Sequence, residues 1–344
     1  MKTGIVRDWR YAEHRMGDYH PESPERIRII YEMLEREKIF ADCQHIPPRP
    51  ATEQEIEFIH SPEYFAQIKE TAGKERVYLD PDTSTSPRSY EVALLAAGGL
   101  LAAADEIMEG KIRNAFALVR PPGHHAEASQ ARGFCIFNNV AIAAQHLIQK
   151  HGLARILIVD WDLHHGNGTQ NSFNSRDDVL YFSTHQFPYY PGSGHWSEVG
   201  SGRGEGFTVN VPLSAGKEDA DYVFIFERLL SPIAMAYRPG FILVSAGFDI
   251  YAGDPLGGMM VSAEGFGALT SLLLDLAEQT AGGRILLTLE GGYNLLGLEE
   301  GVKNTLLILA GEKPALPKHG PSAPLERELG PIFKVQQTFW PVGI

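Results

Sequence analysis

The sequence predicts an α/β fold: a single domain with a mainly parallel central sheet flanked by helices on both faces. Three observations lead to this prediction. Short apolar runs alternate with longer segments of helical character, no repeat or linker divides the first 310 residues, and several apolar runs end abruptly in polar residues. Because ligands of open α/β sheets lie outside the carboxyl ends of the strands, we expect the active site at those strand ends.

Five apolar runs have the length and the β-branched content of buried strands. They are Ala115–Val119, Ile156–Val159, Val179–Phe182, Phe241–Ser245 and Arg284–Leu289. Six longer segments have the length and periodicity of helices. They are Pro24–Glu37, Pro62–Gly73, Ser89–Glu109, Asn139–His151, Asp219–Tyr237 and Ala263–Thr280.

The last part of the chain differs in composition, so we place a domain boundary there, with the main domain at 1–312 and a tail at 313–344. Four prolines between 314 and 324 predict an extended segment, which ends in the apolar sequence Phe339-Trp340-Pro341. The tail either packs along its own domain or contacts a neighbouring subunit, so a homo-oligomer is one alternative.

Composition narrows the classes of partner. The 344 residues carry a formal net charge of −13, which argues against nucleic acid because phosphate binding needs clustered Lys and Arg. A positively charged substrate would be attracted. Only two cysteines occur, so we expect no disulfide framework and a reducing, cytoplasmic location. The N-terminus has no signal-peptide pattern and no apolar run is long enough to span a membrane, so we expect no membrane partner.

The residues that follow Ile156–Val159 predict a metal site. Burying Asp160, Asp162 and His164 at a strand end is costly unless a metal or partner charges compensate. One residue separates Asp162 from His164, so an extended strand end can direct both to one side. Asp249 would add a third ligand, which leaves a position open for water, as in catalytic zinc sites. This ligand set is harder than zinc usually has, so Fe²⁺, Co²⁺ or Mn²⁺ could compete. The alternative is a structural polar loop.

His124 and His125 follow Pro-Pro-Gly after another apolar run, and histidine is suited to proton transfer near neutral pH. Asp160 could orient one imidazole and Asn167 the other. A carboxylate partner favours the imidazolium, whereas an amide does not. We therefore expect His125 to move the proton and His124 to act electrostatically.

Tyr293 follows two glycines after the run Arg284–Leu289. A phenol beside the metal would donate a hydrogen bond to a carbonyl oxygen as that oxygen becomes negative. The alternative is a buried core tyrosine.

Together these motifs resemble the arginase/deacetylase superfamily, and specifically zinc amidohydrolases of the histone deacetylase type. The matching stretches are HPESPERI (20–27), LDPDTSTSPRSYEVALLAAGG (79–99), RPPGHHAE (120–127), RGFCIFNN (132–139), VDWDLHHGNGTQ (159–170), SAGFDIYAGDPLGG (245–258) and LEGGYN (289–294). Trp161 and Asn167 make the chain similar to the class II branch.

The resemblance implies a fold of the arginase/deacetylase type for residues 1–312 and roles for individual residues. The metal ligands would be Asp162, His164 and Asp249, and the catalytic residues His124, His125 and Tyr293. The tunnel for an acyl-lysine would be walled by Gly133, Phe134, Tyr190 and Leu256. One structural potassium ion would lie near Asp160, Asp162, His164 and Ser183, and a second near Phe173, Arg176, Val179 and Phe207.

The expected function is a zinc-dependent deacetylase that hydrolyses N-acetyl or N-acyl amides of lysine side chains with a metal-activated water, on a peptide, a protein or a small acetylated amine. Tyr293 stands where weakly active class IIa relatives have histidine. Leu256 stands where the polyamine-preferring relative has an acidic residue, which disfavours a polyamine substrate. Asp80 or Asp82 corresponds to the acid that grips the substrate backbone, with a solvated loop as the alternative. The functional alternatives are an acetylpolyamine amidohydrolase, a two-manganese enzyme of the arginase branch, and an inactive acyl-lysine binding module.

Overall fold

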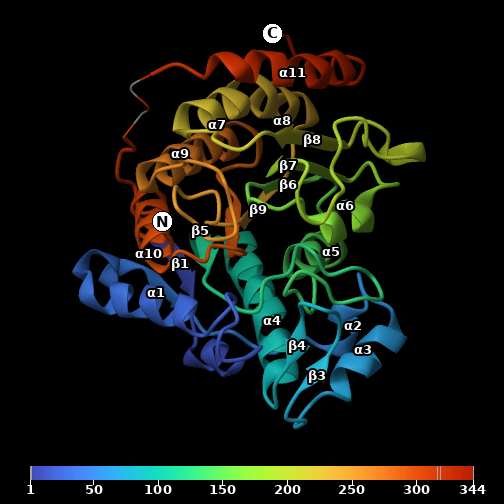
Figure 1. Ribbon diagram of the computed structural model, residues 1–344, viewed down its shortest axis with the longest axis vertical. Helices are drawn as coiled ribbons and strands as arrows, with labels where there is room; N and C mark the ends of the chain where they lie inside the picture. The colour runs from blue at the N-terminus through green and yellow to red at the C-terminus, as the bar shows by residue number, and fades with distance from the viewer. Residues whose placement is uncertain (1, 316, 318, 344) are drawn as a thin grey trace.

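The computed structural model describes residues 2–315, 317 and 319–343, and it confirms the predicted α/β architecture (Figure 1). In the described residues, eight parallel strands form one sheet in the order β2-β1-β5-β10-β9-β6-β7-β8. The strands are β1 Lys2–Val6, β2 Gln44–Ile46, β5 Ile112–Ala117, β6 Ile156–Asp160, β7 Val179–Gln186, β8 Thr208–Leu213, β9 Phe241–Ala246 and β10 Ile285–Leu289. A small antiparallel pair, β3 Val77–Tyr78 and β4 Ser84–Thr85, stands apart.

Helices cover both faces of the sheet (Figure 1). One layer contains α4 Ser89–Met108 and α5 Asn139–His151, which pack on each other and on the strands. The other layer contains α1 Glu25–Arg36, α7 Asp219–Ile225, α8 Ser231–Tyr237, α9 Ala263–Thr280 and α10 Leu295–Leu309. The short helices are α2 Glu53–Ile56, α3 Pro62–Lys69 and α6 Asn167–Phe173. Since helices bury both faces, the central strands are apolar throughout instead of alternating.

Helix α10 was not among the predicted helices, and it contains two glycines, which count against a helix. In the structure, neither glycine could carry a side chain without a steric clash. A Cβ at Gly297 would lie 2.1 Å from the Tyr251 ring, and one at Gly301 would lie 2.6 Å from the Phe248 ring. The helix therefore packs closely against the segment that carries Asp249.

The prediction of an extended tail is wrong for part of it, because residues 323–336 form helix α11 Ala323–Gln336. Pro324 lies in the first turn, where proline is tolerated, and the buried residues follow helical spacing. The tail contacts its own domain: the Trp340 indole N–H donates to the Gly206 carbonyl at 2.8 Å, and the Lys217 ammonium lies 2.9 Å from Glu328. A subunit contact stays a prediction.

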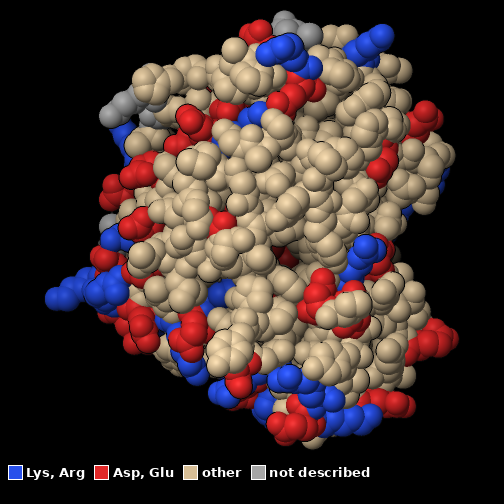
Figure 2. All heavy atoms as spheres, in the orientation of Figure 1, with Lys and Arg blue, Asp and Glu red and all other residues tan. Residues whose placement is uncertain are grey.

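The face shown in Figure 2 is largely uncharged toward its middle, and Lys, Arg, Asp and Glu gather toward its margins. Within the described part of the chain, no helix is both long and apolar enough to cross a membrane.

Candidate active site

Four neighbouring strands of the sheet, β5, β10, β9 and β6, bring the predicted polar segments to one edge. His124 and His125 follow β5, Tyr293 follows β10, and Asp249 follows β9. Asp162 and His164 follow β6 directly. Because all four strands are parallel, their carboxyl ends meet, and the convergence expected from the sequence is present.

Asp162, His164 and Asp249 form a compact group whose ligand atoms all lie within 4.8 Å of one another. The His164 Nδ1 lies 3.2 Å from an oxygen of Asp162 and 3.1 Å from an oxygen of Asp249. Backbone amides hold the carboxylates: Gly291 N–H donates to Asp162 at 2.8 Å, and Leu163 N–H donates to Asp249 at 2.9 Å. These backbone bonds position the carboxylates without using all of their oxygen lone pairs.

Two glycines make room for this group. A Cβ at Gly247 would lie 2.1 Å from an Asp162 oxygen, and a Cβ at Gly291 would lie 2.3 Å from an Asp249 oxygen. Glycine is therefore required where the backbones of two strand ends approach the carboxylates.

The electrostatics of the group fit a bound divalent cation. Asp162 and Asp249 are almost completely buried, and burial together with the neighbouring Asp162 charge raises the pKa of Asp249 to about 7. Burial opposes protonation of His164, but the carboxylates of Asp162 and Asp249 raise its pKa to about 9. Two buried carboxylates this close stabilise positive charge, and the oxygen and nitrogen donors suit a catalytic transition metal with three protein ligands.

The two neighbouring histidines have different partners. His124 Nδ1 lies 3.1 Å from an Asp160 oxygen, whereas His125 Nδ1 lies 2.7 Å from the Asn167 side-chain oxygen. Although burial opposes it, the charges of Asp162 and Asp160 raise the pKa of His124 to about 10. Burial and the adjacent charge on His124 lower the pKa of His125 well below its usual value. These surroundings favour the charged form of His124 and the neutral form of His125.

Glu127 sets the orientation of the Asn167 amide. The Asn167 Nδ2 donates to Glu127 Oε1 at 2.5 Å and to the His125 carbonyl at 3.3 Å, which directs its Oδ1 at His125. His125 Nδ1 must then carry the hydrogen, so Nε2 has the free lone pair. The role of Glu127 was not predicted, although this residue lies two positions beyond His125 in the stretch RPPGHHAE.

Tyr293 also lines the pocket. Its backbone N–H donates to Asp254 at 2.7 Å, and its ring lies edge-on to Phe134 with centroids 5.9 Å apart. The Arg26 guanidinium lies 5.0 Å from the ring centroid. Burial raises the pKa of the Tyr293 phenol well above its usual value, so the hydroxyl stays protonated and can donate a hydrogen bond.

A narrow cavity of about 90 Å³ joins these groups, and it contains all four residues expected to wall the tunnel. Its lining is Asp82, Pro122, His124, His125, Gly133, Phe134, His164, Tyr190, Leu256, Gly291 and Tyr293. Phe134 has a φ of +67°, which is rare outside glycine, and a Cβ at Gly133 would meet the His125 ring at 2.3 Å. Asp82 lines the cavity, whereas Asp80 accepts a bond from the Asp82 backbone N–H at 2.7 Å.

The residues expected around potassium lie on β6, β7 and adjoining loops. Asp160 pairs with Ser183 across β6 and β7, and Asp160 accepts a bond from the Tyr181 hydroxyl at 2.9 Å. In the second set, the Phe173 carbonyl accepts from Arg176 N–H at 2.9 Å. The Phe207 carbonyl accepts from Tyr181 N–H at 2.9 Å, and Val179 begins β7. Both potassium sites stay predictions.

A buried network of charged residues near the pocket was also not predicted. Glu22 binds Arg120 and lies 3.1 Å from Arg26, and Arg26 donates to the carbonyls of Gly292 and Glu290 at 2.7 and 2.5 Å. The Glu290 carboxylate accepts a hydrogen bond from the backbone N–H of Gly123 at 2.7 Å. All four charged residues stand in the stretches that resemble the deacetylase family, and this is the signal that could have found them.

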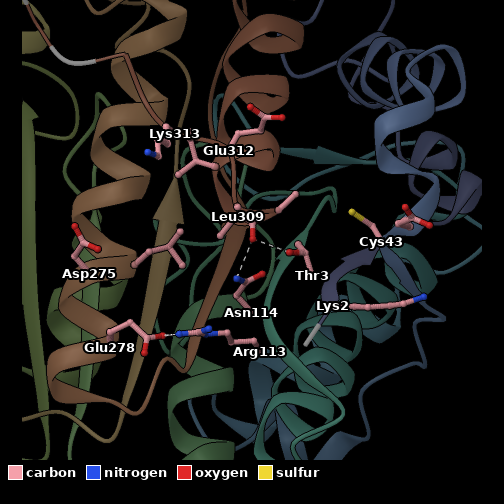
Figure 3. Close-up of a pocket in the computed structure, with 15 residues that line it drawn as sticks. Lys2, Thr3, Cys43, Arg113, Asn114, Asp275, Glu278, Leu309, Glu312 and Lys313 are labelled. Carbon is pink, nitrogen blue, oxygen red and sulfur yellow. Dashed lines mark hydrogen bonds and ion pairs between the residues drawn. The ribbon is translucent and has the colours of Figure 1, made fainter.

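A wider cavity of about 940 Å³ lies at the opposite edge, near the start of β1 and β5 (Figure 3). Charges of both signs line it, and Arg113 pairs with Glu278. The Leu309 carbonyl accepts from Thr3 at 2.8 Å and from Asn114 at 3.2 Å. No histidine is among the described residues that line it, so its size does not make it the active site.

Comparisons with known proteins identify the family of the chain. The family description "Histone deacetylase domain" matches residues 20–309. "Histone deacetylase 15" of Arabidopsis thaliana is 42% identical over 94% of this chain and 59% of its own length. "Polyamine deacetylase HDAC10" of Homo sapiens is 44% identical over 90% of this chain and 48% of its own length. A "Probable deacetylase" of Archaeoglobus fulgidus is 39% identical over 86% of this chain and 83% of its own length.

The solved structure titled "Crystal Structure of HDA15 HD domain" matches with a TM-score of 0.94 and 40% identity, over 99% of this chain and 97% of that one. The chain thus spans roughly half of the length of the first two curated relatives and nearly all of the solved domain. On the match over residues 20–309 and these identities, the chain belongs to the histone deacetylase family.

Proposed function

We propose that the chain is a metal-dependent deacylase that hydrolyses N-ε-acetyl-lysine or a closely similar amide. The observation that carries this proposal is the convergence of the ligand atoms of Asp162, His164 and Asp249 within 4.8 Å of one another, where His164 lines the same narrow cavity as Tyr293. Family membership supports the reaction class.

Zn²⁺ is the ion we propose for Asp162, His164 and Asp249, with Fe²⁺ as the main competitor for this oxygen-rich set. When bound, such an ion polarises an amide carbonyl and makes a water molecule more acidic. The chain's own groups carry out the remaining steps.

The Tyr293 hydroxyl donates a hydrogen bond to the amide oxygen as negative charge develops there. His125 Nε2 takes the proton of the attacking water, whose oxygen bonds to the carbonyl carbon. The same nitrogen then gives the proton to the departing amine as the C–N bond breaks, which yields a carboxylic acid and an amine. The acid gives its proton to the amine, so the final products are a carboxylate and an ammonium group. The carboxylate of Asp160 beside His124 favours the charged form of this imidazole, which stabilises negative charge in the pocket.

The cavity walls favour a lysine side chain. Phe134 and Tyr190 offer aromatic surface to its methylene stem, which is apolar up to the terminal nitrogen. Leu256 contributes no charge at the mouth, so a second ammonium group has no partner from that residue. Asp82 lines the same cavity, and we propose that it accepts hydrogen bonds from a peptide backbone. We also propose a reducing, cytoplasmic setting, supported by the two free cysteines Cys43 and Cys135.

The test is an acyl-substrate panel run together with metal analysis of the same preparation. We expect acetyl-lysine peptide to be hydrolysed with a kcat/KM at least tenfold above that of acetylspermidine, and hydroxamates to inhibit. A higher kcat/KM for acetylspermidine than for the acetyl-lysine peptide would instead identify acetylated polyamines as the substrate class. If the zinc-loaded protein hydrolysed no amide in the panel, the proposed enzymatic activity would be refuted and the alternative of an acyl-lysine binding module would remain.

A further inference from the structure

A second group of metal-binding side chains lies outside the pocket, where α4 packs against α5 (Figure 1). Asp105 is on α4, and His146 and His151 are on α5. Both imidazoles place Nε2 at 2.8 Å from the same oxygen, Asp105 Oδ1, and the three ligand atoms lie within 4.8 Å of one another. We propose that Asp105, His146 and His151 form a second divalent-metal site, which takes Zn²⁺ and links the two helices.

The spacing of the donors is close to what zinc requires. Tetrahedral zinc with bonds of about 2.0–2.1 Å holds neighbouring donor atoms about 3.3 Å apart. Each imidazole nitrogen is 2.8 Å from the Asp105 oxygen, so a separation of about half an ångström per pair would admit the ion. The two imidazoles approach Asp105 from different directions, with ring centroids 5.8 Å apart and planes at 68°. Rotations of the two side chains can supply this small change.

The donor types select the metal. Two imidazole nitrogens and one carboxylate suit zinc and its transition-metal neighbours, whereas Mg²⁺ and Ca²⁺ prefer oxygen donors. The Glu55 carboxylate also lies 3.8 Å from His146 Nδ1, the ring nitrogen that faces away from Asp105. A carboxylate behind a histidine ligand orients the ring and raises its basicity. Arg49 pairs with Glu55 at 2.6 Å and holds that carboxylate in place.

Lys150 is the natural competitor of the ion. Its ammonium lies 2.7 Å from Asp105 Oδ2, the oxygen that the imidazoles do not use. About half of its side chain is exposed to solvent, so it can turn away when a cation binds. An ammonium this close repels a divalent ion, and its removal should strengthen metal binding. A cluster that serves only as an ion pair between helices would show no such gain.

The experiment is equilibrium dialysis of the full chain against low-micromolar free zinc, followed by elemental analysis. Wild type should bind one zinc more per chain than Asp105→Asn or His151→Ala, and Lys150→Met should bind this additional zinc at least threefold more tightly than wild type. His151 is the last residue of α5 and Asp105→Asn keeps the side-chain shape, so both variants should fold, which circular dichroism checks. The exposed Asp275→Asn is the matched control and should bind as wild type does.

The difference between wild type and variant decides the proposal, so the outcome does not depend on whether the active-site pocket is filled. Equal zinc content in wild type, Asp105→Asn and His151→Ala would overturn the proposal. So would a Lys150→Met variant that binds no more tightly than wild type. Where the difference is found, anomalous scattering at the zinc edge should place the ion about 2.0–2.2 Å from both Nε2 atoms.

Discussion

Replacing Tyr293 with phenylalanine tests the most specific part of the proposed mechanism. The change deletes one hydroxyl and keeps the ring, so the contacts with Phe134 and Arg26 are preserved. The backbone bond from Tyr293 N–H to Asp254 is also unaffected. Folding stability and metal content should therefore stay close to those of wild type.

The expected loss is in turnover. The phenol stays protonated because burial raises its pKa, so it donates a hydrogen bond at every pH at which the enzyme works. Removing one preorganised donor to a developing oxyanion costs about 100- to 1000-fold in kcat, or about 2.7–4 kcal/mol. Since this bond strengthens only as charge develops, KM should change little.

Steady-state kinetics on an acetyl-lysine peptide measures this effect, with zinc content determined on the same samples. Tyr190→Phe is the matched control because it removes a phenol from the same cavity. The Tyr190 oxygen is 3.3 Å from Arg132 Nε, at a half-exposed position, so we expect less than a tenfold loss. A Tyr293→Phe variant with wild-type kcat, or one no slower than Tyr190→Phe, would refute the assigned role.

Three further changes follow from the buried charges. The Glu22→Gln variant should lose about 3–5 kcal/mol of unfolding free energy in urea, because it leaves buried guanidinium groups unpaired. Burial opposes ionisation of Glu22, but these guanidinium groups lower its pKa from 4.5 to about 2. A lowered carboxyl pKa stabilises the folded state, here by about 3 kcal/mol of unfolding free energy. Wild type should lose this stabilisation as pH falls from about 4.5 towards 2. Acid unfolding that is identical in wild type and variant would contradict this. With Asn167→Asp, a carboxylate should raise the pKa of His125 and move the acid limb of the kcat/KM profile to higher pH; an unmoved limb would count against His125 as the base. Asp254→Asn should lower kcat at least tenfold by freeing the Tyr293 backbone, with zinc content unchanged, and normal kcat would exclude this positioning.

The parts of the fold that could be predicted have a local signal. Strand β6 is an apolar run that ends in Asp160, and β9 is one that is followed three residues later by Asp249; this pattern located both the central sheet and the metal group. Strand β1 has no comparable signal, because Gly4 interrupts a short run. The reason for that glycine is long-range: a Cβ there would lie 2.6 Å from the side chains of Ile112 and Ile46, on the two neighbouring strands.

The parts of the site that were missed depend on contacts between distant segments. Asp254 was visible as a loop carboxylate, but its bonds to the backbone N–H groups of Tyr293 and Asn294 appear only when β9 and β10 lie side by side. Glu127 likewise acquires its role from Asn167, which lies 40 residues away in sequence. A single sequence indicates which side chains can bind a metal or transfer a proton. It does not indicate which groups from distant segments will form hydrogen bonds with them.

The central claim is that Asp162, His164 and Asp249 share one divalent cation on which amide hydrolysis depends. The most direct test is a crystal structure of the zinc-loaded chain, with anomalous data at the zinc edge and turnover measured on the same preparation. We predict an anomalous peak about 2.0–2.2 Å from His164 Nδ1 and from one oxygen of each carboxylate. An active preparation with no peak between these three residues would contradict the claim.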